Sequence, residues 1–359
     1  MVSDTEQVST TADTTPVARG LKRQVIGLWV VVLCFIAVGI ARSIQVGIPF
    51  RDPGGDYLRG RIAETVGFFI ALVLVDGLLR TRGRRAPRAV LTTIRQRWTP
   101  KRIGLAWVAL IAYHLTYFTY HNLKSWDVFL TNRDKMLLSW DKALFFGHSP
   151  AVLLHDLFGE HLAAHVFMVW YETFPVIVLV AFPAAIVLPR RLRDGYADIA
   201  SFAWIWILGT ITYYAIPSLG PFEVAPKEFA GLPHSMIQTT QAAYLAQRNF
   251  LLAHPHSPHG WAQISAFASL HVGVTTVIFG LAVRHRLRIP SILLGVFLVG
   301  TMLATVYLGW HFAVDIPAGL VIGALSLWLG PRTVGVRRRI TGERATDRRG
   351  RLESPPAST

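Results

Sequence analysis

The stretch Tyr307-Leu-Gly-Trp-His-Phe-Ala-Val-Asp-Ile-Pro-Ala-Gly319 lies where two long apolar segments meet, at residues 289–308 and 311–330. An apolar run of roughly 20 residues is long enough to cross the hydrocarbon core of a bilayer as a helix. The two segments are therefore predicted to form a pair of transmembrane helices joined by a short turn. That turn carries His311, and an ionisable residue at the end of a membrane span usually has a functional role.

Six more apolar segments precede this pair. They occupy residues 25–45, 62–80, 103–120, 164–188, 197–217 and 265–283. The chain is 52% hydrophobic and only 16% charged, a balance that is typical of polytopic membrane proteins rather than soluble domains. We therefore predict an all-α, polytopic membrane helix bundle of about eight transmembrane helices. The first segment follows a polar stretch and lacks a small-residue cleavage site, so we expect a retained anchor.

The basic residues indicate how the chain is oriented in the membrane. The formal net charge is +15, and the positive residues cluster in Arg80–Arg102, Arg190–Arg193, Arg284–Arg288 and the tail from Arg332 to Arg351. These regions are alternate loops and the C-terminal tail, as the positive-inside rule requires of cytoplasmic segments. Both termini are therefore predicted to be cytoplasmic. The charge points to anionic membrane lipids as partners, and nucleic-acid binding is not expected.

The loops on the other side, at 46–61, 121–163 and 218–264, are predicted to face outside. Residues 121–163 mix apolar and charged side chains at roughly helical spacing, which is typical of an amphipathic segment in the headgroup zone or of a helix packed on the bundle. Residues 218–264 are expected to be a loop that covers the active face. The histidines of His254-Pro-His-Ser-Pro-His259 are interpreted as part of a solvated loop, and we expect no metal site there.

Acidic residues in or near the apolar segments leave two interpretations open. Asp76 and Glu172 are expected to form buried hydrogen bonds or ion pairs, with a substrate-facing role as the less favoured alternative. Asp194 and Asp198 are expected to be solvated or paired with Arg193.

The residues with the clearest chemistry are two histidines and an aspartate. His311 and Asp315 are one helical turn apart, so they share a helix face and the carboxylate can accept a proton from one ring nitrogen. The other nitrogen is then free to act as a nucleophile or base. His271 begins the segment at 265–283, on the same predicted face, and is available as a proton donor. An imidazole can attack phosphorus to form a phosphohistidine, while Ser269 and nearby helix-start amides can bind phosphoryl oxygens.

Two motifs carry a family resemblance. Ala268-Ser-Leu-His271 and the stretch Tyr307–Gly319 resemble the second and third signature motifs of the type 2 phosphatidic acid phosphatase (PAP2) superfamily. They are most similar to its aureobasidin-resistance branch, which includes inositol phosphorylceramide synthases. Weaker similarities lie in Asp141–Pro150 and Tyr213–Pro221, and the likeness spans about residues 103–330.

The resemblance implies a division of the chain and a set of site residues. Residues 103–330 would form a six-helix catalytic membrane domain, preceded by two extra helices and a basic cytoplasmic loop in 21–102. Residues 1–20 and 331–359 are expected to be disordered tails. The resemblance implies no metal or cofactor. Its implied roles are His311 as nucleophile, Asp315 as the residue that orients it, His271 as proton donor, and Ser269, Tyr307, Asp141 and Tyr214 as substrate-binding residues.

The chain departs from the superfamily's pattern at two places. Ala268 replaces the usual proline before Ser269, and Ala304-Thr305 replaces a Ser-Arg pair. No arginine from the third motif is then available to bind phosphate. The candidate cations on the outer face are Arg133, Lys135, Lys142 and Lys227.

The expected function is that of a membrane lipid phosphotransferase. It would move a phosphoryl or headgroup-phosphoryl unit from a lipid phosphate or phospholipid donor to an alcohol acceptor, on the extracytoplasmic face of the plasma membrane. A lipid phosphate phosphatase, with water as the acceptor, is the alternative within the same chemistry. A non-enzymatic transporter with proton-relaying histidines is less favoured, because the polar groups gather at one face and no two halves correspond.

Overall fold

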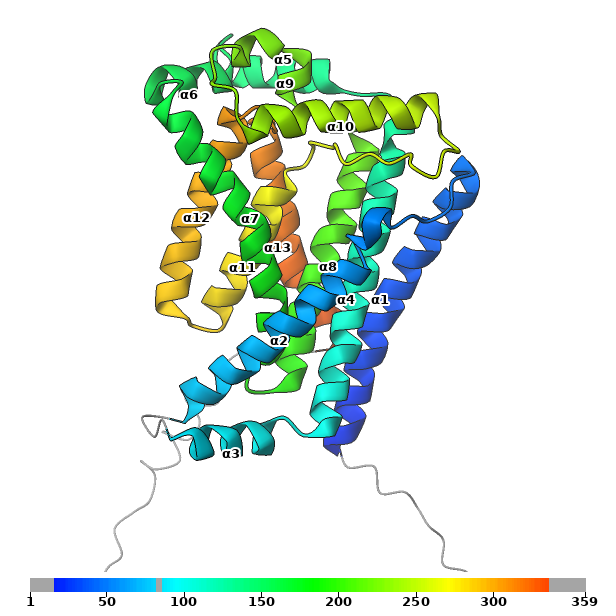
Figure 1. The fold of residues 1–359 in the computed structure, drawn as a ribbon, viewed down its shortest axis with the longest axis vertical. Helices are drawn as coiled ribbons and strands as arrows, with labels where there is room; N and C mark the ends of the chain where they lie inside the picture. Colours follow the sequence, from blue (N-terminus) through cyan, green and yellow to red (C-terminus); the bar gives the residue numbers. More distant parts are fainter. Residues whose placement is uncertain (1–15, 82–85, 336–359) are drawn as a thin grey trace, which may run out of the picture.

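The computed structural model describes residues 16–81 and 86–335, and in this part of the chain every regular element is helical. Figure 1 shows the helices gathered into one bundle. This architecture confirms the predicted all-α polytopic membrane bundle. The first helix begins at Pro16, so the last residues of the predicted N-terminal tail are helical, and the last helix extends to Thr333. The remainder of both predicted tails lies outside the described residues.

Eight long helices take the places of the eight predicted segments. They are α1 (Pro16–Val46), α2 (Arg59–Arg80), α4 (Pro100–Trp126), α7 (Leu162–Val187), α8 (Leu192–Ala215), α11 (Leu270–Arg284), α12 (Arg288–Tyr307) and α13 (Asp315–Thr333). Of the described helices, α1, α2, α4, α7 and α12 are long and apolar enough to cross a membrane by themselves.

Of the other three long helices, α8 and α11 are largely buried, whereas α13 packs on both of them with one side and exposes Val321, Leu325 and Trp328 on the other. α8 contacts α13, α4, α7 and α11, and α13 also packs along α11. The faces that these helices turn toward protein can carry small and polar residues that a lipid-facing surface avoids. Gly319 illustrates this: a Cβ there would lie 2.5 Å from the backbone oxygen of Ser269, so only glycine lets α13 approach α11 this closely.

One end of the bundle is covered by helices that we call the cap, shown at the top of Figure 1. The cap consists of α5 (Asp134–Leu144), α6 (Pro150–Phe158), α9 (Pro221–Val224) and α10 (Met236–Ala253). Residues 218–264 were expected to form a loop, and α10 is the correction. Its sequence carries a capping box, in which Ser235 and Gln238 satisfy each other's backbone amides at the start of the helix.

The segment 121–163 was predicted to be either an amphipathic segment in the headgroup zone or a helix packed on the bundle, and α5 has features of both. α5 buries Asp134, Leu137 and Asp141 against the bundle. Its other side and the following turn expose apolar side chains, with Leu144 63% and Phe146 94% exposed. α5 is therefore both packed and amphipathic. Short 3-10 turns complete the fold at η1 (Pro53–Gly55), η2 (Asp127–Phe129) and η3 (Pro226–Phe229).

The opposite end, which we call the basic end, carries α3 (Pro87–Arg97) and two buried aspartates. Asp76 forms ion pairs with Arg80 (2.7 Å) and Arg97 (2.6 Å), in line with the favoured interpretation of a buried pair. Asp198 is buried, contrary to expectation, because Arg284 (3.1 Å) and His285 (2.6 Å) both reach its carboxylate. Asp194 pairs with Arg193 at 3.4 Å, as predicted.

Candidate functional site

His311 lies in the turn between α12 and α13 and forms a pair with Asp315, the first residue of α13. The Nδ1–H of His311 donates to Oδ2 of Asp315 at 3.1 Å, and the same oxygen accepts the backbone N–H of Phe312 at 3.0 Å. His311 is 3% exposed and Asp315 is fully buried. Because Nδ1 is held by the carboxylate, the lone pair of Nε2 is the one available for chemistry.

His271 faces this pair from the first turn of α11. Its ring centroid lies 5.7 Å from that of His311. The ring also packs on Tyr171 and Phe174 of α7, with centroid distances of 4.5 and 4.4 Å. Unlike His311, His271 keeps part of its surface exposed, and no described residue forms a hydrogen bond with its ring nitrogens. Two imidazoles from distant parts of the sequence therefore meet at one place beneath the cap.

Ser269 explains why these histidines are close. It is the N-cap of α11, where its hydroxyl accepts the N–H of Val272 at 3.4 Å. Its own backbone N–H donates to the carbonyl oxygen of Asp315 at 3.3 Å, so the starts of α11 and α13 are joined directly. The Ser269 side chain is fully buried in this position. The hydroxyl predicted to bind substrate is thus already used within the helix start.

Asp141 supports the turn that carries His311. Its two carboxylate oxygens accept the backbone N–H groups of Ala313 (2.8 Å) and Val314 (2.9 Å). Asp134, on the same face of α5, accepts the N–H groups of Leu219 (2.8 Å) and Gly220 (2.9 Å) in the loop before α9. Burial raises the pKa of each carboxyl to about 6. The sequence pointed to Asp141 but gave no sign of Asp134, because neither bond follows from local spacing.

The two tyrosines predicted to bind substrate use their hydroxyls elsewhere. The Tyr307 hydroxyl donates to the carbonyl oxygen of Gly159 at 2.6 Å, and its ring lies against His155 and Phe167. The Tyr214 hydroxyl donates to the carbonyl oxygen of Leu123 at 2.9 Å. The structure thus joins His271, His311 and Asp315 directly, while the two phenols hold backbone carbonyls.

Trp310 covers the site from the side of the cap. Its ring stacks on Tyr171 at 5.7 Å with an interplanar angle of 5°, and it also contacts Phe222 of α9 and Tyr244 of α10. Two further cap residues hold the end of α12: His155 contacts the Tyr307 carbonyl oxygen at 2.9 Å, and Gln241 donates to that of Leu308 at 3.0 Å. These contacts shield His311 from solvent, and the sequence did not predict them.

Lys124 near the end of α4 is a cation that the sequence analysis missed. Its ammonium lies 5.7 Å from the ring centroid of Tyr213, close enough to His271 for its charge to act on that imidazole. No described carboxylate comes within 4.0 Å of it. Among the predicted candidates, Lys142 pairs with Glu228 at 3.5 Å, whereas Arg133, Lys135 and Lys227 are exposed on the cap. The sequence could have indicated Lys124, because a lysine at the end of a long apolar helix is unusual.

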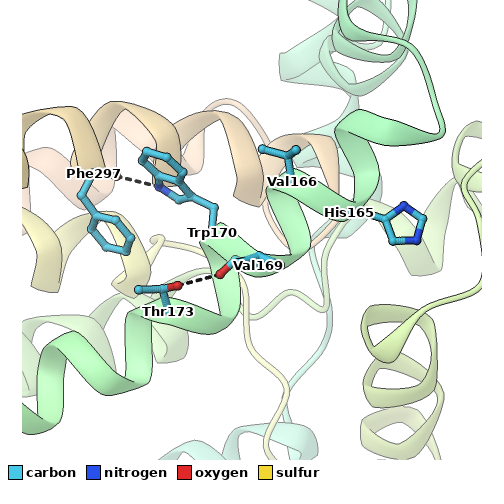
Figure 2. A pocket seen from close by; sticks show the side chains of 6 residues that line it. All are labelled: His165, Val166, Val169, Trp170, Thr173 and Phe297. Atoms are coloured by element: carbon cyan, nitrogen blue, oxygen red, sulfur yellow. Dashed lines mark hydrogen bonds between the residues drawn. The ribbon is translucent and has the colours of Figure 1, made fainter.

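A groove of about 540 Å³ runs between α7 and α12, and Figure 2 shows its lining. Trp170 lies across it, donating its indole N–H to the carbonyl oxygen of Phe297 at 3.1 Å. Val166 and Val169, which are 52% and 61% exposed, also line it. Tyr171 and Phe174, the α7 residues that contact His271, are not among the residues that line the groove.

Residues 16–81 and 86–335 contain no group of three or more His, Cys, Asp or Glu side chains arranged as metal ligands. This search included His254, His256 and His259, which lie after the end of α10.

Comparison with known proteins gives one match. A family model described as the PAP2 superfamily matches residues 135–329, which is more than half of the chain. The matched region runs from α5 almost to the end of α13, so it includes both histidines, Asp315 and Asp141 and leaves out α1 to α4. No curated protein and no solved structure matches the chain.

Proposed function

The chain belongs to the PAP2 superfamily, and we propose that it is a membrane-embedded phosphotransferase that moves a phosphoryl-containing group from a lipid donor to an alcohol. Membership supports an enzyme of the phosphatase or phosphotransferase type with lipid phosphates as substrates. The observation that carries the finer proposal is the His311–Asp315 pair, held at 3.1 Å, with the ring of His271 at 5.7 Å.

In the proposed first step, Nε2 of His311 attacks the phosphorus of the donor. A P–N bond forms, the P–O bond to the donor's alcohol breaks, and a protonated His271 gives its proton to the leaving oxygen. Asp315 stabilises the positive charge that develops on the His311 ring. The donor leaves as a neutral alcohol and His271 is left neutral.

In the second step, the acceptor alcohol gives its proton to His271 while its oxygen attacks phosphorus. The P–N bond breaks and His311 returns to its starting form, so the residues alone complete the cycle. Water in place of the alcohol would make the enzyme a lipid phosphate phosphatase, because the same groups serve both acceptors.

The burial of His311 supports transfer over hydrolysis. The residue is 3% exposed, and Trp310 with its neighbours in α9 and α10 covers it. A phosphohistidine formed there would be shielded from bulk water, so an acceptor that binds in place has the advantage. The motif resemblance to inositol phosphorylceramide synthases points the same way.

Lys124 is proposed as the cation that offsets the charge of the bound phosphate. It is half-buried, and the one described carboxylate that acts on its charge, Asp127, lies beyond 4.0 Å, so the ammonium can still bind a second anion. The phosphate of the lipid is such an anion. Lys124 would then take the place of the phosphate-binding arginine that Ala304-Thr305 lacks in the third motif.

We also propose that the cap and the site face the extracytoplasmic side of the plasma membrane. The arginines of the basic end, among them Arg80, Arg97 and Arg284, support a cytoplasmic location for that end. Both termini would then be cytoplasmic.

The proposal can be tested with purified protein in liposomes that contain phosphatidic acid or phosphatidylinositol labelled with ³²P. Myo-inositol and a short-chain diacylglycerol serve as acceptors, each compared with no acceptor. We expect label to pass to an added alcohol and a base-stable, acid-labile phosphoprotein to form, with both lost in His311→Ala.

If free phosphate is released at the same rate with and without acceptor, the enzyme hydrolyses the lipid phosphate and does not transfer its phosphoryl group. Unchanged turnover in a correctly inserted His311→Ala protein would remove the mechanism altogether.

A further inference from the structure

α5 presents two buried carboxylates on one face, two helical turns apart. Each binds a pair of consecutive backbone amides in a different loop: Asp134 those of Leu219 and Gly220, and Asp141 those of Ala313 and Val314. All four N···O distances are between 2.8 and 2.9 Å. A single short helix of the cap therefore holds two loops that meet at the site, since the N–H of Phe222 donates to Gly309.

The amides held by Asp141 belong to the start of α13. The first N–H groups of a helix have no partner within the helix, and a side chain usually caps them. Val314 stands at the N-cap position of α13, and no side-chain cap comes from the turn itself. Asp141 supplies that cap from another helix, so it fixes both the start of α13 and the turn of residues 308–314.

The position of this turn determines where His311 points. Ala313 and Val314 follow His311 by two and three residues, and Asp315, its partner, comes next in the chain. A displacement of about 1 Å at a reacting group can lower a rate by roughly 100-fold. A carboxylate that locks the turn therefore affects reactivity without touching the reactants.

We propose that Asp141 is a positioning residue, which holds the 308–314 turn so that Nε2 of His311 faces the phosphorus, and that it does not contact the substrate. This rests on the proposed function, and it assigns Asp141 a different role from the substrate contact implied by the family resemblance. Both carboxylate oxygens are occupied by amides, and the residue is 3% exposed.

The surroundings of Asp141 agree with this role. The charged groups that act on it are Asp315 of α13, which is paired with His311, and Glu228 of η3, which is paired with Lys142. No described cation lies within ion-pair distance of Asp141 itself, so its partners are the two amides. Both carboxylate oxygens accept an amide, whereas in Asp141→Asn one of them becomes an NH2 group, which can only donate.

The test compares Asp141→Asn with a matched control, Asp156→Asn, in liposomes. Asp156 is an exposed aspartate on α6 in the same cap. Turnover of labelled phosphatidic acid gives kcat and KM, and hydrogen exchange reports the protection of the amides at residues 312–316. We expect kcat to fall by about tenfold or more in Asp141→Asn, with KM unchanged and faster exchange at Ala313 and Val314. Asp156→Asn should match the wild type in all three.

A second variant keeps the charge and both acceptor oxygens. Asp141→Glu lengthens the side chain by one methylene, so it should recover part of the kcat and part of the amide protection at Ala313 and Val314 that Asp141→Asn loses. Thermal unfolding of both variants checks that each is folded, and a folded Asp141→Glu protein with no recovery of either quantity would contradict the proposal.

Two results in Asp141→Asn would contradict the proposal. A raised KM with normal kcat in Asp141→Asn would mean that the residue binds substrate. Normal kcat and normal amide protection would mean that Asp141 does not hold the 308–314 turn. If His311→Ala keeps full turnover, the proposed function itself fails. If His311→Ala is inactive while Asp141→Asn retains turnover and protection, the positioning role alone fails.

Discussion

The two ends of the bundle each contain a histidine paired with a buried aspartate. At the capped end, Nδ1 of His311 lies 3.1 Å from Asp315, and at the basic end Nε2 of His285 lies 2.6 Å from Asp198. Both carboxylates are buried, and each accepts a hydrogen bond from its histidine. Their surroundings differ, and the difference separates a candidate reaction centre from a structural contact.

At the basic end, an arginine shares the carboxylate. Arg284 bonds Asp198 at 3.1 Å and donates to the carbonyl oxygen of Leu327, so the cluster ties α8, α11 and α13 together. At the capped end, Asp315 receives one imidazole and one backbone amide, and a second imidazole, His271, stands opposite. A His–Asp pair alone therefore does not identify a reaction centre. His285, like His311, has only one ring nitrogen bonded, so the second imidazole is what distinguishes the capped end.

The largest expected effect comes from replacing the two aspartates in turn. Asp315→Asn should lower turnover by about a thousandfold or more, because an amide no longer holds the proton on Nδ1 or stabilises the imidazolium. Asp198→Asn should leave turnover within about twofold but lower Tm, since Arg284 loses its partner in a buried pair. Lipid phosphate turnover in liposomes and thermal unfolding of the same samples provide the measurements. Equal kinetic losses in both variants would show that the two ends are not distinct.

The second imidazole offers the next test. His271→Gln should lower turnover of an alkyl lipid phosphate by about 100-fold, because the leaving alkoxide then lacks a proton donor. An aryl phosphate, whose leaving group needs no proton, should lose much less. The ratio of the two losses is the measurement. The same loss on both substrates would mean that His271 positions the phosphate and donates no proton.

A smaller effect is expected from the cation at the capped end. Lys124→Met keeps the apolar stem and removes the charge, and we expect KM for lipid phosphate to rise by about tenfold. Lys135→Met, which removes an exposed lysine of α5, is the matched control and should change KM by less than about twofold. Steady-state kinetics at fixed salt measure both. A normal KM in Lys124→Met would show that Lys124 does not bind the phosphate.

The smallest effects concern the pH dependence of stability, and they fall in different windows for the two ends. Burial raises the pKa of Asp141 from 3.8 to about 6, so its ionisation costs stability as pH rises through that interval. The hydrogen bond to Asp198 raises the pKa of His285, with Arg284 opposing and Asp194 adding to the shift. That stabilisation is fully present below about 6.5 and is lost as pH rises through the folded value.

Tm should therefore fall by a few degrees in each window as pH rises. Asp141→Asn should reduce the fall of Tm between about pH 3.8 and 6. His285→Gln should reduce the fall of Tm above about pH 6.5. Thermal unfolding between pH 4 and 9 measures the two slopes. A His285→Gln protein with the wild-type slope above pH 6.5 would contradict the ionised pair at the basic end.

Local patterns in the sequence predicted the parts of the molecule that depend on local chemistry. Apolar length located the eight long helices, and the i, i+4 spacing of His311 and Asp315 gave their hydrogen bond. The pattern of Ser235 and Gln238 could also have indicated α10, which was instead expected to be part of a loop. Helix starts and turn-to-turn contacts are encoded within a few residues, so they can be read in the sequence.

Long-range partners were beyond the reach of such patterns. Asp141 was singled out, but its bonds to Ala313 and Val314 join residues far apart in the chain. Asp198 was expected to be solvated or paired with Arg193, because nothing local shows that Arg284 and His285 return to it. Lys124 was missed because its importance depends on what lies across the bundle. Each error concerns a side chain whose partner is set by helix packing.

The amphipathic character of α5 has a practical consequence for biochemical work. One side of this helix exposes Trp140, Leu144 and the adjacent Phe146, while the other side holds the turn of His311 through Asp141. We therefore expect the medium that solvates that edge, whether native lipid, nanodisc or detergent micelle, to affect the position of His311, the proposed nucleophile. A purified sample can therefore be inactive while its circular dichroism spectrum is intact. Its activity should be measured again after return to lipid before the protein is classed as inactive.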